Sequence, residues 1–74
     1  MQIRVRLVGA FRVGRFTEQT QDYPCGSSVK DVVARLQLPE QILGIALIND
    51  THATFTDLLH DGDKLTLLPI LEGG

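Results

Sequence analysis

One segment of the chain, residues 29–36, has the pattern of an amphipathic helix and limits the fold more than any other feature. Its apolar residues recur at i, i+3, i+4 and i+7, so they form one stripe on the helix surface: Val29, Val32, Val33 and Leu36. Ser28 is a suitable N-cap, and Asp31 can reach back to it or place negative charge in the first turn. Pro39 ends the helix, because the residue before a proline avoids helical backbone angles. A single stripe can cover only one face of a sheet.

Strand patterns lie on both sides of this helix. Residues 2–8 alternate apolar side chains with arginines, which is the period-two pattern of a strand with one buried face. Residues 45–49 are almost wholly apolar, as expected of a buried strand. In the last strand pattern, Leu65 and Leu67 fall on one face and Leu68 falls on the other. The expected strands are residues 2–8, 15–23, 45–49, 52–55 and 64–69, with 52–55 the briefest.

The order of these elements predicts the fold class. Two strands precede the helix and three follow it, which favours an α+β fold of the β-grasp (ubiquitin-like) type. We expect a roll with a mixed sheet of about four to five strands and one main helix packed on one face. The 74 residues are expected to form one domain over residues 1–69, followed by a flexible C-terminal tail over residues 70–74.

Composition argues against several classes of protein. The formal net charge is −2 and the pI is near 5.5, which does not favour a nucleic-acid-binding domain. Cys25 is the single cysteine, so no internal disulfide can form and a small secreted scaffold is not expected. No apolar run approaches the roughly 18 residues that a membrane span needs. We therefore expect a cytoplasmic protein that engages neither nucleic acid nor a membrane.

The C-terminal segment LLPILEGG indicates where the function lies. Gly73 and Gly74 lack a Cβ, so they can take backbone angles closed to other residues and pass through a narrow channel. The five residues after Pro69 can reach roughly 17 Å when fully extended. The residues before the glycines are expected to dock a partner or, alternatively, to complete the core: Leu68, Pro69, Ile70 and Leu71.

The α-carboxylate of Gly74 is the reactive group of this segment. A carboxylate is a poor electrophile because its negative charge repels nucleophiles, but transfer of AMP from ATP creates a mixed anhydride with a good leaving group. Sulfide can then displace AMP and leave a thiocarboxylate, which is a competent sulfur nucleophile. Glycine suits this chemistry because no side chain crowds the carbonyl carbon. Gly74 is therefore the candidate sulfur-carrying residue, with Gly73 as its slim neighbour.

Four segments in a fixed order resemble the MoaD/ThiS family of ubiquitin-like sulfur carriers, and the likeness covers essentially the whole chain. They are IRVRLVGAFR, SSVKDVVARL, ALIND and LLHDGDKLTLLPILEGG, the last being the most specific. The resemblance implies that an adenylating, ubiquitin-activating-like enzyme activates Gly74 and consumes ATP, while this chain binds no cofactor tightly. It also implies that the sulfur passes to a biosynthetic enzyme. The chain would then be a carrier and a non-catalytic subunit rather than an enzyme.

The resemblance leaves the receiving pathway open. In the molybdopterin branch the chain would be the small subunit of molybdopterin synthase, bound to a large subunit, whereas in the thiazole branch it would supply the thiamin precursor. The loop VGAFRVGRF and Pro69 favour the molybdopterin branch, but Ile70 and Glu72 depart from its usual ending. Two other functions remain as alternatives. A ubiquitin-like modifier would use the same activated glycine to form amides with lysines, and an interaction module would not need Gly73 and Gly74.

The cysteine and the two histidines are expected to have no chemical role. Cys25 lies in the turn before the helix and is expected to be structural or incidental rather than a sulfur relay. His52 and His60 do not have the spacing of metal ligands, so we expect no metal site. With no nucleophile and base in a recognisable pattern, we expect no catalytic residue.

The remaining charged candidates are expected to have structural roles. Asp61 and Asp63 flank Gly62 and are expected to shape a turn rather than to form an acid/base pair. Arg4 and Arg6 are expected on the solvent-facing side of the first strand, with contact to a partner as the alternative.

Overall fold

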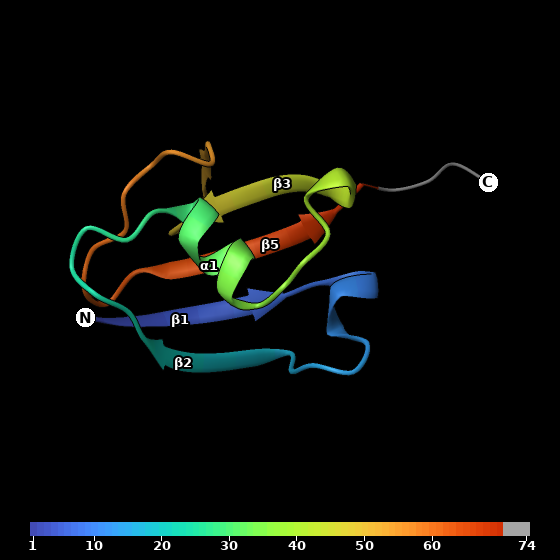
Figure 1. Cartoon of the computed structure of the whole chain (residues 1–74), viewed down its shortest axis with the longest axis horizontal. Coiled ribbons are helices and arrows are strands. Elements are labelled where there is room, and N and C mark those ends of the chain that lie inside the picture. Colours follow the sequence, from blue (N-terminus) through green and yellow to red (C-terminus); the bar gives the residue numbers. More distant parts are fainter. Residues whose placement is uncertain (71–74) are drawn as a thin grey trace.

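The computed structural model describes residues 1–70, and these form a five-stranded mixed sheet with one α-helix lying across one face (Figure 1). The strand order is β2-β1-β5-β3-β4, in which β1 and β5 are parallel and the other neighbours are antiparallel. This is the α+β arrangement that the sequence predicts. The elements are β1 (Gln2–Leu7), η1 (Gly9–Arg12), β2 (Glu18–Asp22), α1 (Val29–Arg35), η2 (Glu40–Ile42), β3 (Leu43–Ile48), β4 (Thr51–Ala53) and β5 (Lys64–Pro69).

The core lies between α1 and one face of the sheet. The apolar stripe of the helix is confirmed, since its three valines are fully buried and Leu36 packs against them from the rim. From the sheet, alternate residues of β1 and β5 complete the core: Ile3, Val5, Leu7, Leu65 and Leu67. Phe11 is also buried, because the short 3-10 helix η1 turns it inward from a segment expected to be a loop.

Several strand boundaries and one burial prediction were wrong. The strand expected over residues 45–49 is β3, which already starts at Leu43 because its pairing with β5 begins opposite Pro69. The second strand was expected from residue 15, but β2 starts at Glu18 because the chain first turns through Gly14, whose φ is +71°. The strand expected at 52–55 is β4, which ends at Ala53, since Asp57 accepts a hydrogen bond from the Thr54 amide and closes a turn. The third strand was expected to be buried, yet Ile45 in β3 is 39% exposed because α1 covers only one sheet face.

The start of α1 is held by a complete capping box. The Asp31 amide donates to Ser28 Oγ at 3.4 Å, and the Ser28 amide donates to Asp31 Oδ2 at 2.8 Å. The next two free amides are also satisfied, because Val29 and Lys30 donate to backbone carbonyls of the loop after β4. The helix is therefore fixed to the sheet through both its apolar stripe and its first turn.

Replacing the capping hydroxyl should lower the stability of the whole domain. We expect Ser28→Ala to reduce the free energy of unfolding by about 1 kcal/mol, because the Asp31 amide loses its side-chain acceptor and keeps only the Ser28 carbonyl, at 3.1 Å. Urea denaturation followed by circular dichroism measures the change. Ser28→Thr keeps an acceptor and serves as the matched control. An unchanged denaturation midpoint in Ser28→Ala would show that the box contributes nothing.

Candidate functional site

The last strand, β5, lies in the middle of the sheet and carries the chain toward its C-terminal residues (Figure 1). It pairs with β1 on one side and β3 on the other, so that Leu67 has Leu7 and Ala46 as its neighbours across the sheet. A central strand paired on both sides is a rigid base for whatever follows it. Three of the predicted functional residues, Leu71, Gly73 and Gly74, lie outside the described residues.

The C-terminal end of β5 is fastened by backbone hydrogen bonds on both sides. The Val8 amide donates to the Leu67 carbonyl at 3.2 Å, and the Ile70 amide donates to the Ile42 carbonyl at 2.6 Å. Pro69, which has no amide proton to donate, lies between these two fastenings. Backbone hydrogen bonds to the folded domain therefore extend as far as Ile70, the first residue of the predicted tail.

The two faces of β5 are different, as predicted. Leu65 and Leu67 are fully buried beneath α1, whereas Leu68 is only half-buried on the opposite, open face. Ile45 lies beside Leu68 in the adjoining strand and is also partly exposed. Ile70 follows with half of its surface exposed. These apolar residues lie outside the buried core cluster, and their role in docking a partner stays a prediction.

Residues of β3, of β5 and of the segment that joins β1 to η1 together line an apolar groove of about 310 Å³ at this end of the sheet. It brings together three of the four predicted docking residues with four that the sequence reasoning missed. The lining residues are Val8, Gly9, Gly44, Ile45, Leu68, Pro69 and Ile70. The missed residues come from β3 and from the start of η1, so only the three-dimensional pairing reveals them. We name this feature the root groove.

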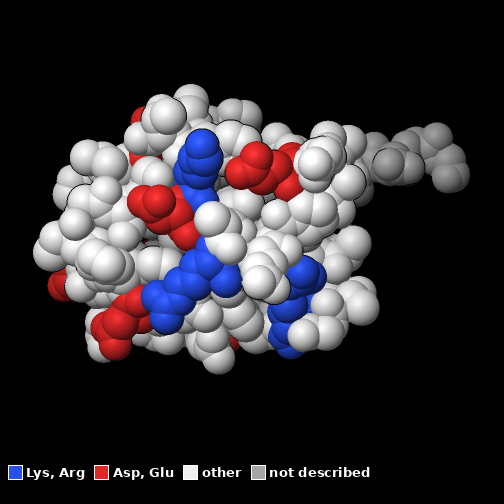
Figure 2. Space-filling model, viewed as in Figure 1, with Lys and Arg blue, Asp and Glu red and all other residues white. Residues whose placement is uncertain are grey.

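Basic side chains lie on the same open face as the root groove. In the register of the sheet, Arg4 pairs with Lys64 and Arg6 with Thr66, which places both arginines on the face that carries Leu68. Both are exposed, as predicted, and Arg4 makes a 3.8 Å ion pair with Glu18 of β2. On the opposite, helix-bearing face, basic and acidic groups are interspersed (Figure 2).

Comparison with known protein families gives a match over residues 5–74 to the model of the ThiS family. The chain belongs to the ThiS family. Its fold also resembles a chain of the complex of subunits 1 and 2 of the molybdopterin-converting factor from Helicobacter pylori 26695. That likeness has a TM-score of 0.68 and 25% identity and covers 100% of both chains. No curated protein matches the sequence.

Two further structures share the fold of this ThiS-family chain at lower identity. Small archaeal modifier protein 1 from Haloferax volcanii has a TM-score of 0.77 and 19% identity, with 95% of this chain and 98% of that chain covered. Urm1 from Trypanosoma brucei has a TM-score of 0.71 and 20% identity, with 99% and 95% covered. The fold is therefore the ubiquitin-like β-grasp fold of the MoaD/ThiS sulfur carriers, as the resemblance implied.

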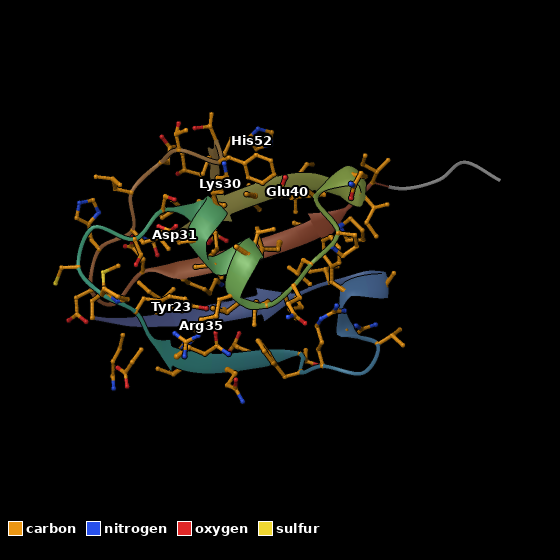
Figure 3. The ribbon with its side chains drawn as sticks, viewed as in Figure 1. Tyr23, Lys30, Asp31, Arg35, Glu40 and His52 are labelled. Atoms are coloured by element: carbon orange, nitrogen blue, oxygen red, sulfur yellow. The ribbon has the colours of Figure 1, made fainter. Side chains whose placement is uncertain are left out.

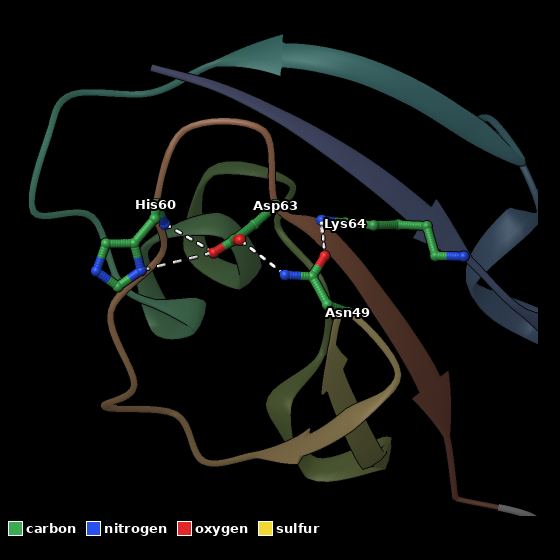
Figure 4. Close-up of polar contacts among 4 residues, drawn as sticks. All are labelled: Asn49, His60, Asp63 and Lys64. Carbon is green, nitrogen blue, oxygen red and sulfur yellow. Dashed lines mark hydrogen bonds and ion pairs between the residues drawn. The ribbon is translucent and has the colours of Figure 1, made fainter.

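The acidic turn before β5 is structural in the ThiS-family chain, as predicted (Figure 4). Asp63 accepts from the His60 amide and from Asn49 Nδ2, both at 2.8 Å, and Asn49 Oδ1 accepts from the Lys64 amide at 3.0 Å. Asp61 accepts from the Gln2 amide at 2.7 Å. These bonds join the turn to β1 and to the β3–β4 hairpin, so they fix where β5 begins.

The other candidate residues of the ThiS-family chain do not assemble into a reactive site. His52 and His60 line the same shallow depression, but no three histidine, cysteine or acidic side chains within residues 1–70 lie as metal ligands would. Cys25 is exposed in the turn before α1. Beside that turn, Arg35 stacks over the Tyr23 ring, with its Cζ atom 4.5 Å from the ring centroid (Figure 3). Burial raises the pKa of Tyr23, and the Arg35 charge partly opposes the rise.

The α-helix found in residues 1–70 spans seven residues, and neither it nor any other described helix has the length and apolar character to cross a bilayer.

Proposed function

We propose that this ThiS-family chain is a sulfur carrier whose Gly74 carboxyl group is adenylated by a partner enzyme and then converted to a thiocarboxylate. The observation that carries the proposal is the position of the root groove. A central, doubly paired strand leads straight into it, and the chain that continues from it ends in Gly73 and Gly74. An exposed apolar surface at the base of a reactive segment is well placed to bind the enzyme that acts on that segment.

The chemistry requires two partner-dependent steps. In the first, an oxygen of the Gly74 carboxylate attacks the α-phosphorus of ATP, so that pyrophosphate leaves and an acyl-adenylate forms. In the second, hydrosulfide attacks the acyl carbon, the bond to AMP breaks, and the thiocarboxylate remains. The partner binds ATP and the sulfur donor, so this chain acts as a substrate and carrier rather than as a catalyst. Because the first step consumes ATP, we place this chemistry in the cytoplasm.

The docking role of the root groove is supported by the surface around it. Leu68, Pro69 and Ile70 present exposed apolar surface, and Arg4 and Arg6 lie on the same face of the sheet. Interfaces of this kind combine a desolvated apolar centre with a charged rim that sets orientation. Leu71 would extend the apolar contact toward the glycines.

We favour the cyclic pterin precursor of molybdopterin as the recipient of the sulfur, which would make this chain the small subunit of molybdopterin synthase. The support is the similarity to the molybdopterin-converting factor complex from Helicobacter pylori, which contains subunits 1 and 2. A large subunit of that synthase would then be the second partner. A thiazole-synthesising enzyme is the alternative acceptor, consistent with the ThiS family match.

The proposal is tested by mass spectrometry of the intact protein. After incubation with ATP, sulfide and an adenylating enzyme from the same cell, we expect a gain of about 16 Da, from replacement of one oxygen by sulfur. The matched control omits ATP and should show no gain. Amide-linked Gly-Gly remnants on lysines of other proteins would instead indicate a modifier. Absence of both an AMP adduct and a sulfur gain with every such enzyme would contradict the proposal.

A further inference from the structure

Gly44 differs from the other glycines of residues 1–70 in the reason for its presence. The other four have positive φ angles, which side-chain-bearing residues adopt at a cost: Gly9, Gly14, Gly26 and Gly62. Gly44 lies in β3 without such an angle, so its backbone conformation would suit any residue. An isolated glycine within a strand often marks a close approach of another backbone.

A side chain at position 44 would meet the chain that leaves β5. A Cβ placed there would lie 3.0 Å from the Ile70 nitrogen and 3.1 Å from the Ile70 Cα and from the Pro69 carbonyl carbon. Carbon atoms in favourable contact lie at about 3.5–4.0 Å, so each of these distances is too short. The crowded atoms belong to the backbone and cannot rotate away as the end of a side chain could. Alanine at this position would therefore displace Pro69 and Ile70.

The pairing of β3 with β5 explains the close approach. Leu43 pairs with Pro69 and Ile45 with Leu68, so Gly44 is an extra residue in β3 at an irregularity of the ladder. Just before it, the Ile42 carbonyl accepts from the Ile70 amide at 2.6 Å. The hydrogen bond thus holds Ile70, and the absence of a side chain at Gly44 leaves room for the backbone of Pro69 and Ile70 beside it. We name Ile42 and Gly44 the root clasp.

We propose that Gly44 is a positioning residue, which lets the root clasp set the direction in which the chain leaves the sheet toward Gly74. This inference rests on the proposed function, because direction matters only if Gly74 must reach a partner's active site. Four residues follow Ile70 and can span at most about 14 Å, so the position of Ile70 sets which part of a partner's surface Gly74 can reach. A misplacement of even about 1 Å at a reacting group can slow a reaction a hundredfold.

The test compares Gly44→Ala with Gly62→Ala in the full chain. Gly62 has a φ of +85° and open space around it, so alanine there strains the backbone without touching the root. It precedes β5, at the end of the sheet away from the root groove (Figure 1). Two readouts are used: hydrogen exchange of the Ile70 amide by NMR, and kcat and KM for ATP-dependent adenylation.

The root clasp predicts a specific pattern. Gly44→Ala should speed exchange of the Ile70 amide and lower kcat about tenfold or more. KM should rise by a smaller factor, because Pro69 and Ile70 line the root groove and move, whereas Leu68 and the two arginines keep their places. Gly62→Ala should change neither readout. Equal effects of both variants would overturn the inference, since they would reflect stability alone, and so would a Gly44→Ala variant that matches the unmodified chain in both readouts. If the unmodified chain is never adenylated, the proposed function fails, while the exchange rate of Ile70 still decides whether the clasp holds the root.

Discussion

Removal of Gly73 and Gly74 should abolish formation of the thiocarboxylate and leave the folded body unchanged. Residues 1–70 make the sheet, the helix and their hydrogen bonds without the last two residues, so thermal unfolding should occur at the same temperature. The truncated chain still has a terminal carboxylate, now on Glu72, but this group is two residues short of the reach that the adenylating site requires. We expect the rate of adenylation to fall by at least about a hundredfold.

A second variant separates reach from chemistry. One alanine added after Gly74 keeps every native residue but moves the terminal carboxylate outward and places a methyl group beside it. We expect this extended chain also to resist adenylation, because a narrow channel that admits glycine excludes a Cβ. Pyrophosphate release measures both variants. Normal sulfur loading of either the shortened or the extended chain would show that Gly74 is not the reactive residue.

Local patterns in the sequence were sufficient for most of the fold. The helix follows from the spacing of Val29, Val32 and Val33 together with its Ser28 cap, all within one short segment. The alternation of Leu67 and Leu68 likewise separates the covered face from the open one. These inferences succeed because the period of burial depends only on the type of element that carries the residues.

Features that depend on distant pairing could not be predicted in this way. The root groove includes Val8 and Ile45, which neighbour Leu68 only because β1 and β3 flank β5 in the sheet. The close approach at Gly44 depends on an irregular ladder between β3 and β5. A glycine among apolar residues was a usable signal, but the sequence alone does not say which backbone approaches it. Burial of Phe11 likewise required the turn that η1 makes.

The residues that the sequence indicated for the candidate site fall into two groups. The sequence indicated Leu68, Pro69 and Ile70 as a docking surface, and the structure brings them into one groove. It indicated Gly73 and Gly74 from the chemistry that an unhindered terminal carboxylate allows, and those residues lie outside the described part of the chain. Their role is therefore a prediction for the truncation experiment to decide.

Replacement of two adjacent leucines of β5 should have opposite effects: one should lower the melting temperature, and the other should raise KM for the adenylating enzyme. Leu67 is fully buried beneath α1, so Leu67→Ala removes apolar contacts and leaves a cavity, at an expected cost of about 3 kcal/mol. For a domain of this size, that loss lowers the melting temperature by about 12 to 24 °C. Well below that temperature the folded fraction keeps its open face, so KM for the adenylating enzyme should be unchanged.

Leu68→Asp should have the reverse effect, because Leu68 faces the root groove and is only half-buried. The carboxylate can remain partly hydrated in the free protein, so the melting temperature should change little. Docking would bury that charge without a partner, and KM should rise about tenfold or more. Thermal unfolding and steady-state adenylation kinetics, measured on both variants, give the comparison. If Leu68→Asp is adenylated with normal KM, the partner binds elsewhere, whereas an unchanged melting temperature in Leu67→Ala would contradict the assignment of the covered face.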